Sequence, residues 1–269
     1  EKIRSTFIKS YLIDAHVNSK VYTTFHSMAT DEGGARTGRF SSSDPNLQNI
    51  PIRTEDGAKI RRAFIMDDGH KQVRDYDLSQ IEYRMLAHFA VGEGGAAVRK
   101  RYWDDPTLDY HKMIGEIIFE MTGIRLERVF VKTANFGLVY GLGKAALADQ
   151  LGVPLKESIA LSKTFHTAVP FARETMDAIS KEVQRTGIVE TILGRQSHFD
   201  LWEKAGYGEK DEGFPLPYRA AFAKWGHDIM RAYTYRAVNY KLQGSAADHM
   251  KKGMVKAWKD GVYAATGVP

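Results

Sequence analysis

The segment DYDLSQIEYR at residues 75–84 carries the residue types that bind divalent cations. Asp75 and Asp77 lie two residues apart, so on a strand their carboxylates point to the same face. Apolar residues at helical spacing follow, which predicts a strand-to-helix junction here. Paired carboxylates at such a junction suit Mg²⁺, a cation that prefers oxygen ligands. The alternative interpretation is that Asp77 only caps the helix that follows.

A second segment places two cations and then two aromatic residues at intervals of four. Arg128 and Lys132 come first, and Phe136 and Tyr140 follow. Residues four apart are neighbours on one helix face. The cations can therefore hold phosphate groups, and the rings can stack on a nucleobase and its sugar. This order fits an extended ligand that is anionic at one end and carries a planar ring at the other. The alternative is a helix whose cations extend over buried aromatic side chains.

Two polar segments have the residue types that contact nucleic acid. TGRFSSSDPNLQNIP at residues 37–51 is rich in hydrogen-bonding side chains, and its Arg39 can reach a phosphate or a base edge. Asn239 and Gln243 share one helix face, and their amides can read the minor-groove acceptors that every base pair presents. The alternatives are a plain surface loop and a pair of solvated amides.

The amino-acid composition excludes several classes of protein and of functional site. The 269 residues include 38 Lys and Arg against 33 Asp and Glu, a net charge of +5 that favours anionic partners such as nucleic acid. The absence of cysteine excludes disulfide scaffolds, thiolate zinc sites and cysteine nucleophiles. No run approaches 18 uninterrupted apolar residues, so we expect no membrane partner. The first residues lack the layout of a signal peptide, and a cytoplasmic location is expected.

The spacing of apolar residues predicts short strands and many helices around these segments. Helices are predicted at residues 2–16, 79–91, 107–186 (with breaks at glycines), 219–242 and 246–259. Strands are predicted at residues 20–28, at 62–64 with 72–78 as a hairpin, and at 187–193 as a hairpin arm. Residues 203–218 are predicted to form an exposed loop because glycine and proline recur there.

The four chemical segments occur together and in a fixed order: TGRFSSSDPNLQNIP, DLSQIEYR, the helix at residues 128–141, and QGSAAD at residues 243–248. In this they resemble the family A DNA polymerases, the group of bacterial DNA polymerase I and its phage relatives. The resemblance runs from about residue 20 to the end. It implies an α+β fold: a partial polymerase palm (an antiparallel sheet with helices) plus a helical fingers subdomain.

The resemblance also implies a division of the chain. Residues 1–19 would be the end of the thumb or a connecting helix, and residues 20–95 the first part of the palm with motif A. Residues 96–225 would form the fingers, and residues 226–269 the second part of the palm, ending before motif C.

Roles at the reacting end follow from the same resemblance. Asp77, with the Leu78 carbonyl, is implied as the ligand of two Mg²⁺ ions, and Asp77 and Lys132 as the catalytic residues. Glu82 is implied as the steric gate that occupies the place of a ribose 2′-OH. Gln80 is implied as its neighbour in the nucleotide pocket.

Further contacts are implied for the incoming dNTP and for DNA. Arg128, Lys132 and His111 correspond to the residues that hold the triphosphate. Phe136 and Tyr140 correspond to the aromatic pair near the sugar and the templating base. The implied minor-groove contacts with the primer-template are Arg39, Asn239 and Gln243.

The chain departs from the family pattern in several places. Leu78 stands where a Tyr is usual, Tyr83 replaces an aliphatic residue, and Tyr235 stands where a basic residue is usual four positions before Asn239. The segment at residues 200–225 is longer than in the bacterial enzymes.

The main departure concerns motif C, a His-Asp-Glu hairpin that normally lies some 15–30 residues beyond QGSAAD. The pair His227-Asp228 precedes Gln243 and is predicted to be a helix-surface pair instead. Two-metal chemistry needs a second carboxylate beside Asp77. We therefore expect a split or interrupted polymerase in which a second polypeptide supplies motif C, with a separate exonuclease as a further candidate partner.

The expected function is template-directed DNA synthesis from dNTPs by two-metal nucleotidyl transfer, in a bacterial or phage-infected cell. Two alternatives stay open. One is a polymerase remnant that binds primer-template DNA without catalysis. The other is a single-subunit RNA polymerase, against which Glu82 argues as a gate that prefers deoxynucleotides.

Overall fold

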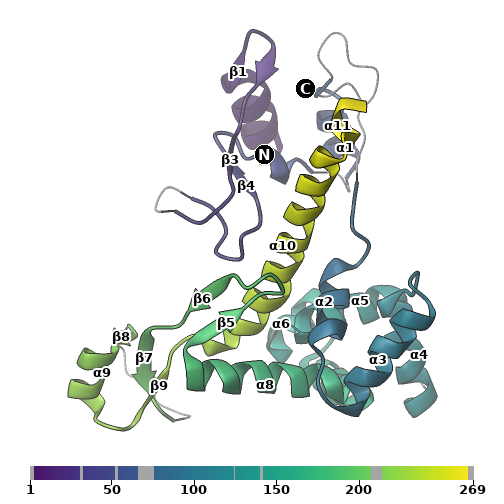
Figure 1. The fold of residues 1–269 in the computed structure, drawn as a ribbon. Helices are drawn as coiled ribbons and strands as arrows, with labels where there is room; N and C mark the ends of the chain where they lie inside the picture. Colours follow the sequence, from purple (N-terminus) through teal and green to yellow (C-terminus); the bar gives the residue numbers. More distant parts are fainter. Residues whose placement is uncertain are drawn as a thin grey trace. The chain divides into compact units, whose positions relative to one another are not determined.

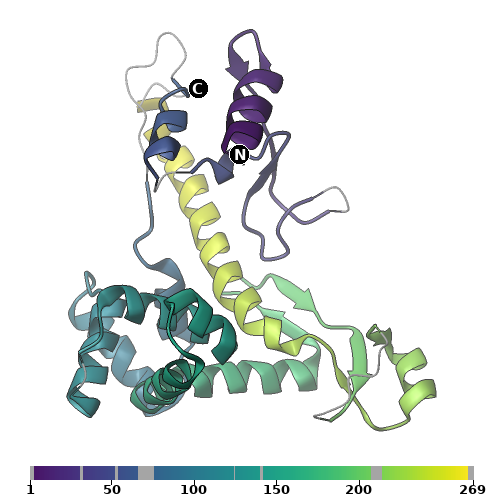
Figure 2. The ribbon, with the colours of Figure 1, turned by 180° about the vertical axis from the view of Figure 1, so that it is seen from behind.

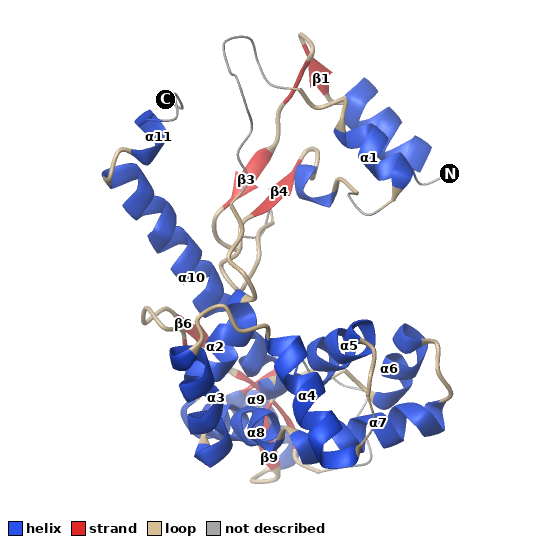
Figure 3. Cartoon of the chain, turned by 90° about the vertical axis from the view of Figure 1, so that its right-hand side faces the viewer, coloured by secondary structure: helices blue, strands red, loops and turns tan. Residues whose placement is uncertain are grey.

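The computed structural model describes residues 3–30, 33–51, 54–65, 76–123, 125–139, 142–206 and 214–265, without the side chains at positions 122, 136, 138, 139, 264 and 265. Contacts divide the chain into two compact units: unit 1 is Glu1–Leu78 with Ala247–Pro269, and unit 2 is Ser79–Ala246. Helices dominate and the strands form small antiparallel sheets, so the predicted α+β class is confirmed (Figures 1 and 3). The palm and fingers boundaries at residues 20, 96 and 226 stay predictions.

Unit 1 consists of short elements and the end of a long helix. Its elements are η1 (Ile3–Asp14), β1 (His16–Val17), β2 (Lys20–Val21), β3 (Thr24–His26), β4 (Ser41–Ser43), η2 (Leu47–Asn49), α1 (Glu55–Arg61), the last part of α10 (Ala237–Lys259) and α11 (Val262–Ala265). The predicted helix and strands before residue 28 are confirmed in these positions. Residues 62–64 instead continue α1 in turns, because Ala63 N–H and Phe64 N–H bond back to Ile60 and Arg61 carbonyls. The strand predicted there is wrong, and residues 66–75 lie outside the described part.

Unit 2 is mainly helical, and most of its helices contribute to one apolar core (Figure 2). The helices are α2 (Ile81–Phe89), α3 (Gly92–Asp104), α4 (Tyr110–Thr122), α5 (Arg128–Val139), α6 (Lys144–Leu151), α7 (Leu155–Ala168), α8 (Pro170–Thr186), α9 (Tyr218–Trp225) and the start of α10. Leu86, Ile114, Leu147 and Phe165 are buried in the core. The helical series predicted over residues 107–186 is confirmed.

Short strands complete unit 2. β5 (Ile188–Glu190) pairs with β6 (Gln196–His198), which confirms the predicted hairpin arm. β7 (Leu201–Lys204) lies between β8 (Leu216–Pro217) and β9 (Ile229–Arg231). The helix α9 packs on these three short strands and not in the apolar core.

The helix predicted over residues 219–242 is wrong. α9 ends at Gly226, whose φ of 62° and ψ of −135° leave the helical region, and β9 and η3 (Thr234–Arg236) intervene before α10. His227 and Asp228 consequently lie in the connection between α9 and β9, not on a helix surface.

Arg231 joins the end of α8 to these strands. Its Nη1 donates to the Phe199 carbonyl at 2.7 Å and its Nε to the Gln184 carbonyl at 3.3 Å. The guanidinium also lies 4.6 Å from the ring centroid of Trp202. Gly187 has φ of 75°, and a Cβ there would lie 2.6 Å from the Arg231 guanidinium carbon. Position 187, where the end of α8 meets the Arg231 side chain, therefore requires glycine.

In the part of the chain that the structure describes, none of the helices combines the length and the apolar character that crossing a bilayer requires.

Candidate nucleotide-binding site

The N-terminus of α4 is held by Asp109. Its Oδ1 accepts the backbone N–H groups of His111 (2.9 Å) and Lys112 (3.2 Å), two of the donors that a helix start leaves unpaired. Its Oδ2 accepts from Nη2 of Arg128 at 2.7 Å, which ties α4 to the first turn of α5. Burial acts to raise the pKa of Asp109, but the Arg128 hydrogen bond, the two N–H groups and the Arg128 charge lower it to about 2.

His111 is paired with Asn135 inside unit 2. Its Nδ1 lies 3.0 Å from the side-chain nitrogen of Asn135, and both side chains are buried. The amide nitrogen of Asn135 faces Nδ1, while its Oδ1 is buried without a partner among the described residues. In this orientation the amide donates and Nδ1 accepts, from which we infer that the imidazole proton is on Nε2. Burial lowers the pKa of His111, and the charges of Arg128 and Lys132 lower it further against the opposing effect of Asp109. The geometry thus favours a neutral imidazole with an Nε2 donor.

Gln80 joins the start of α2 to α4. It occupies the N-cap position with φ of 52°, and its Oε1 accepts the N–H of Tyr110 at 2.8 Å. The ring of Tyr110 stacks on Tyr83 with centroids 4.5 Å apart, and Tyr83 meets His111 edge-on at 4.7 Å. Gln80 and Tyr83, both from the segment at residues 75–84, thus contact Tyr110 and His111 at the start of α4. Glu82 itself is half-buried on α2.

A pocket of about 290 Å³ opens between α4 and α5. Asp109, His111 and Arg128 line one part of it. The remaining lining residues are Lys112, Gly115, Glu116, Phe119, Glu120, Arg125, Leu126 and Val131. The lining thus combines the cations Lys112, Arg125 and Arg128 with the acidic residues Asp109, Glu116 and Glu120.

Lys132 lies one turn after Arg128 on α5 and is exposed. Its charge acts on His111, so these two residues and Arg128 form one electrostatic group. Of the predicted phosphate contacts, His111 and Arg128 line the pocket, and Lys132 follows one turn later on α5. For the aromatic pair, the Phe136 side chain and all of Tyr140 lie outside the described part.

Asp77 is exposed, and Leu78 is half-buried. The N-cap of α2 is Gln80, so the alternative that Asp77 caps this helix is wrong. Tyr76–Leu78 also lack strand structure, and Asp75 lies outside the described residues. Asp77 and the Leu78 carbonyl offer oxygen donors of the kind that Mg²⁺ prefers. However, the described residues hold no group of three or more His, Asp or Glu side chains that could bind a metal, so the donor set present does not fit two ions by itself.

The loop around Arg39 is ordered by its own hydrogen bonds. Ser42 Oγ donates to Asn46 Oδ1 at 2.9 Å, and the Tyr11 hydroxyl donates to the Asn46 carbonyl at 2.8 Å. Lys251 of α10 donates to the Ser27 carbonyl at 2.7 Å within the same unit. Arg39 is exposed on this framework.

Asn239 and Gln243 lie one turn apart on α10 and are half-buried. The residues after them have structural partners: the Ser245 hydroxyl accepts the Ile192 N–H at 3.0 Å, and the Gly244 carbonyl accepts from Arg195 Nη2 at 3.1 Å. The glycine and serine of QGSAAD therefore seat the β5–β6 hairpin on α10. This packing explains part of the motif without any ligand.

Sequence reasoning missed two residues of this site. Asp109 precedes an apolar helical pattern, which is the usual position of an N-cap, and this signal could have identified it. Asn135 falls between the stripe residues Lys132 and Phe136. Nothing in the spacing marks it, because its role depends on which side chain of α4 faces it.

The sequence model described as DNA polymerase family A matches residues 1–264. DNA polymerase I of Thermus aquaticus is 35% identical over 256 residues, covering 95% of this chain and 27% of that protein. DNA polymerase I of Geobacillus stearothermophilus is 33% identical over 259 residues, covering 94% and 26%. The chain thus spans about a quarter of the length of these relatives.

A solved structure agrees with the sequence relatives. The POL domain of Pol1 from M. smegmatis, in complex with DNA primer-template and dNTP, matches with a TM-score of 0.65 and 27% identity, covering 97% of this chain and 41% of that one. With the family match over nearly its whole length, this chain belongs to DNA polymerase family A.

Proposed function

We propose that this chain takes part in template-directed DNA synthesis and binds the incoming dNTP through α4 and α5. The observation that carries the proposal is the group formed by Arg128, Lys132 and His111, held in place by Asp109 and Asn135. Phosphoryl transfer depends mainly on positioning and charge stabilisation. A prepared set of cationic and N–H donors is what a triphosphate requires.

Each member of this group has a separate role in the proposal. Lys132, which is exposed, contacts the triphosphate as a point charge. Arg128 is paired with Asp109 and can offer the guanidinium N–H groups that this ion pair leaves over. His111 donates from Nε2 as a neutral imidazole, because Asn135 occupies Nδ1. Gln80 acts by positioning, since its side-chain oxygen is already used by Tyr110.

The sugar and base contacts rest on the family membership alone. Glu82 is proposed as the gate against a 2′-OH, and Phe136 and Tyr140 as the residues beside the sugar and the templating base. Arg39, Asn239 and Gln243 are proposed to contact the minor groove of the primer-template. The M. smegmatis relative was solved with both DNA and dNTP, which supports these two ligands.

The described residues do not bring together enough donors for two metal ions. Asp77 and the Leu78 carbonyl are the proposed protein ligands, and bound Mg²⁺ would stabilise charge on the transferred phosphoryl group. Two-metal transfer requires a second carboxylate beside Asp77. In the split-enzyme form of this proposal, a second polypeptide carries that carboxylate, and a separate exonuclease performs proofreading.

Primer extension tests the proposal. The purified chain is assayed with Mg²⁺ and dNTPs, alone and with a polypeptide that carries motif C, and a gel shift confirms DNA binding. Extension only with the added polypeptide supports the split form, whereas extension by the chain alone refutes it. Equal use of rNTPs by the active enzyme would favour the RNA polymerase alternative.

The non-catalytic alternative is tested by the same assays. DNA affinity that persists while no motif C polypeptide restores extension would support it. An active enzyme whose Asp77→Ala variant binds DNA but does not extend a primer would exclude it. On either account the protein acts where bacterial or phage DNA is copied, in the cytoplasm.

A further inference from the structure

Unit 2 has a second pocket, between α2 and α3. This pocket shares no lining residue with the α4–α5 pocket. It has a volume of about 250 Å³. Its lining residues are Arg84, Ala87, His88, Arg99, Tyr102 and Trp103. Two guanidinium groups, an imidazole and two aromatic rings thus surround it, and no carboxylate belongs to this lining.

Both arginines are fixed by backbone carbonyls. Arg84 donates from Nε to Ser79 (3.0 Å) and from Nη2 to Pro106 (2.6 Å), and its guanidinium carbon lies 5.0 Å from the centroid of Tyr102. Each guanidinium carries five N–H groups. Arg84 therefore keeps donors for a ligand while its position is already determined.

Arg99 is held in the same way from α3. Its Nη1 donates to the carbonyls of Ala87 on α2 and of Ala90, the residue that follows α2. The Asp105 carboxylate interacts electrostatically with Arg84 but accepts the N–H and hydroxyl of Thr107 at 2.8 and 2.6 Å and is not one of the residues that line the pocket. Fixed cations without a carboxylate in the pocket lining select an anion.

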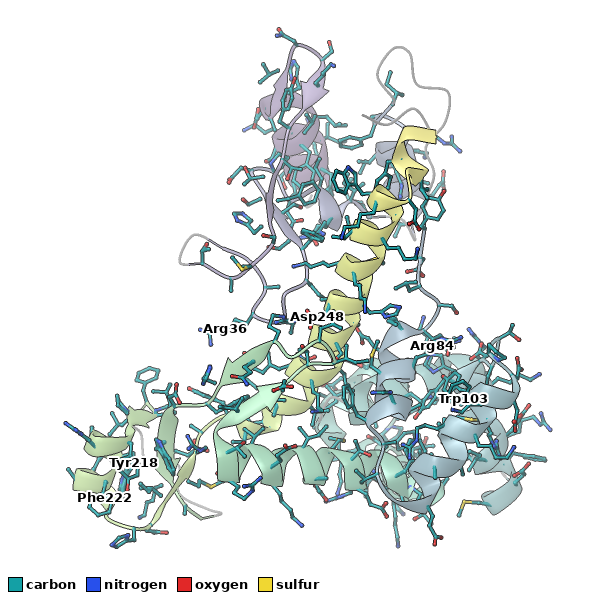
Figure 4. All side chains as sticks on the ribbon, viewed as in Figure 1. Arg36, Arg84, Trp103, Tyr218, Phe222 and Asp248 are labelled. Atoms are coloured by element: carbon teal, nitrogen blue, oxygen red, sulfur yellow. The ribbon has the colours of Figure 1, made fainter. Side chains whose placement is uncertain are left out.

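Trp103 adds an aromatic surface to the two cations of this pocket. Its side chain is 84% exposed although α3 packs on α2 through neighbouring residues, and Figure 4 shows it beside Arg84. An exposed indole next to cations offers a stacking surface for a flat, electron-poor or heteroaromatic ring. The Tyr102 hydroxyl is buried and has no hydrogen-bond partner among the described residues.

We propose that this pocket binds one nucleotide, with the phosphate at Arg84 and Arg99 and the base on Trp103. The space admits a single small unit, so the ligand is a free nucleotide or one nucleotide of single-stranded DNA. The site is independent of the proposed dNTP site, because the two pockets share no lining residue.

The test uses the exposed residues, since Arg84 and Arg99 also hold the fold. Binding of a 12-mer oligothymidylate and of dTMP is measured for Trp103→Ala, His88→Ala and a control, Trp258→Ala, which removes another exposed indole. We expect Trp103→Ala to weaken binding roughly tenfold, His88→Ala to weaken it less, and the control to bind as wild type. An oligomer bearing 5-iodouracil should photocrosslink to Trp103, as located by mass spectrometry.

Comparison of dTMP with the oligothymidylate shows whether the site binds a free nucleotide or single-stranded DNA. Weaker binding of both ligands in Trp103→Ala means that a free nucleotide suffices, and an effect on the oligomer alone means that single-stranded DNA is the ligand. Both results support the site. Unchanged affinity for both ligands, with crosslinks only at other residues, would overturn it. Thermal unfolding of each variant shows that any change in affinity does not reflect loss of the fold.

Discussion

The side-chain nitrogen of Asn135 lies 3.0 Å from Nδ1 of His111, and both residues are buried. The orientation of the Asn135 amide in this contact is the basis for placing the imidazole proton on Nε2. It links α5, which bears the proposed phosphate cations, to the start of α4. It also makes His111 a donor at neutral pH without a positive charge, because burial and the neighbouring cations lower its pKa.

Asn135 variants test this tautomer. Asn135→Ala leaves Nδ1 buried without a partner and should lower the free energy of unfolding by about 1–3 kcal/mol. Asn135→Asp places a carboxylate there and should raise the pKa of His111. Imidazole ¹⁵N shifts measured by NMR against pH report both states. A wild-type His111 that is protonated on Nδ1 at pH 7 would contradict the assignment.

Stability should fall as the pH is lowered, in two stages. The folded-state pKa values of His111 and Asp109 both lie below their unfolded values of 6.5 and 3.8. The folded state therefore binds fewer protons, and stability present above each unfolded pKa is lost as the pH falls. The His111 loss begins below about pH 6.5, and the Asp109 loss runs between about pH 4 and 2.

Urea unfolding at a series of pH values checks these two stages. His111→Phe should flatten the slope between pH 7 and 5 relative to wild type while leaving the slope below pH 4. If the difference between wild type and this variant is independent of pH from 7 to 5, His111 does not titrate as described.

Removal of Asp109 should cost more than removal of its ionic partner. Asp109→Ala loses the cap of α4 as well as the ion pair, about 1–2 kcal/mol. Arg128→Met loses only a pair whose arginine side chain is 65% exposed, about 1 kcal/mol or less. Chemical denaturation of the two single variants and the double variant separates these contributions. Equal losses in the two single variants would mean that the cap contributes nothing.

The hydrogen bonds of Arg231 should be among the contacts that contribute most to the stability of unit 2. Arg231→Met removes the donors to Phe199 and Gln184 and should lower the free energy of unfolding by about 2–4 kcal/mol. Arg219→Met on exposed α9 is the matched control, with an expected change within about 0.5 kcal/mol. Thermal unfolding of both proteins provides the comparison, and a similar change in the two would show that the Arg231 contacts are not needed.

Local signals predicted the elements that depend on local chemistry. Helical spacing located α2 and the series α4–α8, and the alternation before Gly194 located the β5–β6 hairpin. The helix predicted over residues 219–242 failed because its apolar spacing continues across Gly226, where the backbone turns away. Spacing alone could not show that β9 pairs with β7.

For the candidate site, too, the sequence identified some residues and could not identify others. The spacing identified Arg128 and Lys132 as phosphate-binding cations, and the resemblance added His111; both cations act electrostatically on His111 in the structure. Gln80 was assigned to the nucleotide pocket, but the structure gives its oxygen to Tyr110. Asn135 could not be identified because its importance comes from a contact between helices, which no spacing along one helix encodes.

The most direct test of the central claim is whether this chain selects a nucleotide according to the template. Dissociation of a labelled primer-template is timed with each of the four dNTPs, using a dideoxy-terminated primer so that no transfer can occur. We predict that only the complementary dNTP slows dissociation, and that Lys132→Ala requires roughly 10–100 times more of it. Lys156→Ala, which removes an exposed lysine on α7, should match wild type. If DNA binds but the four dNTPs act alike, or if Lys132→Ala behaves as wild type, the proposed nucleotide site is contradicted.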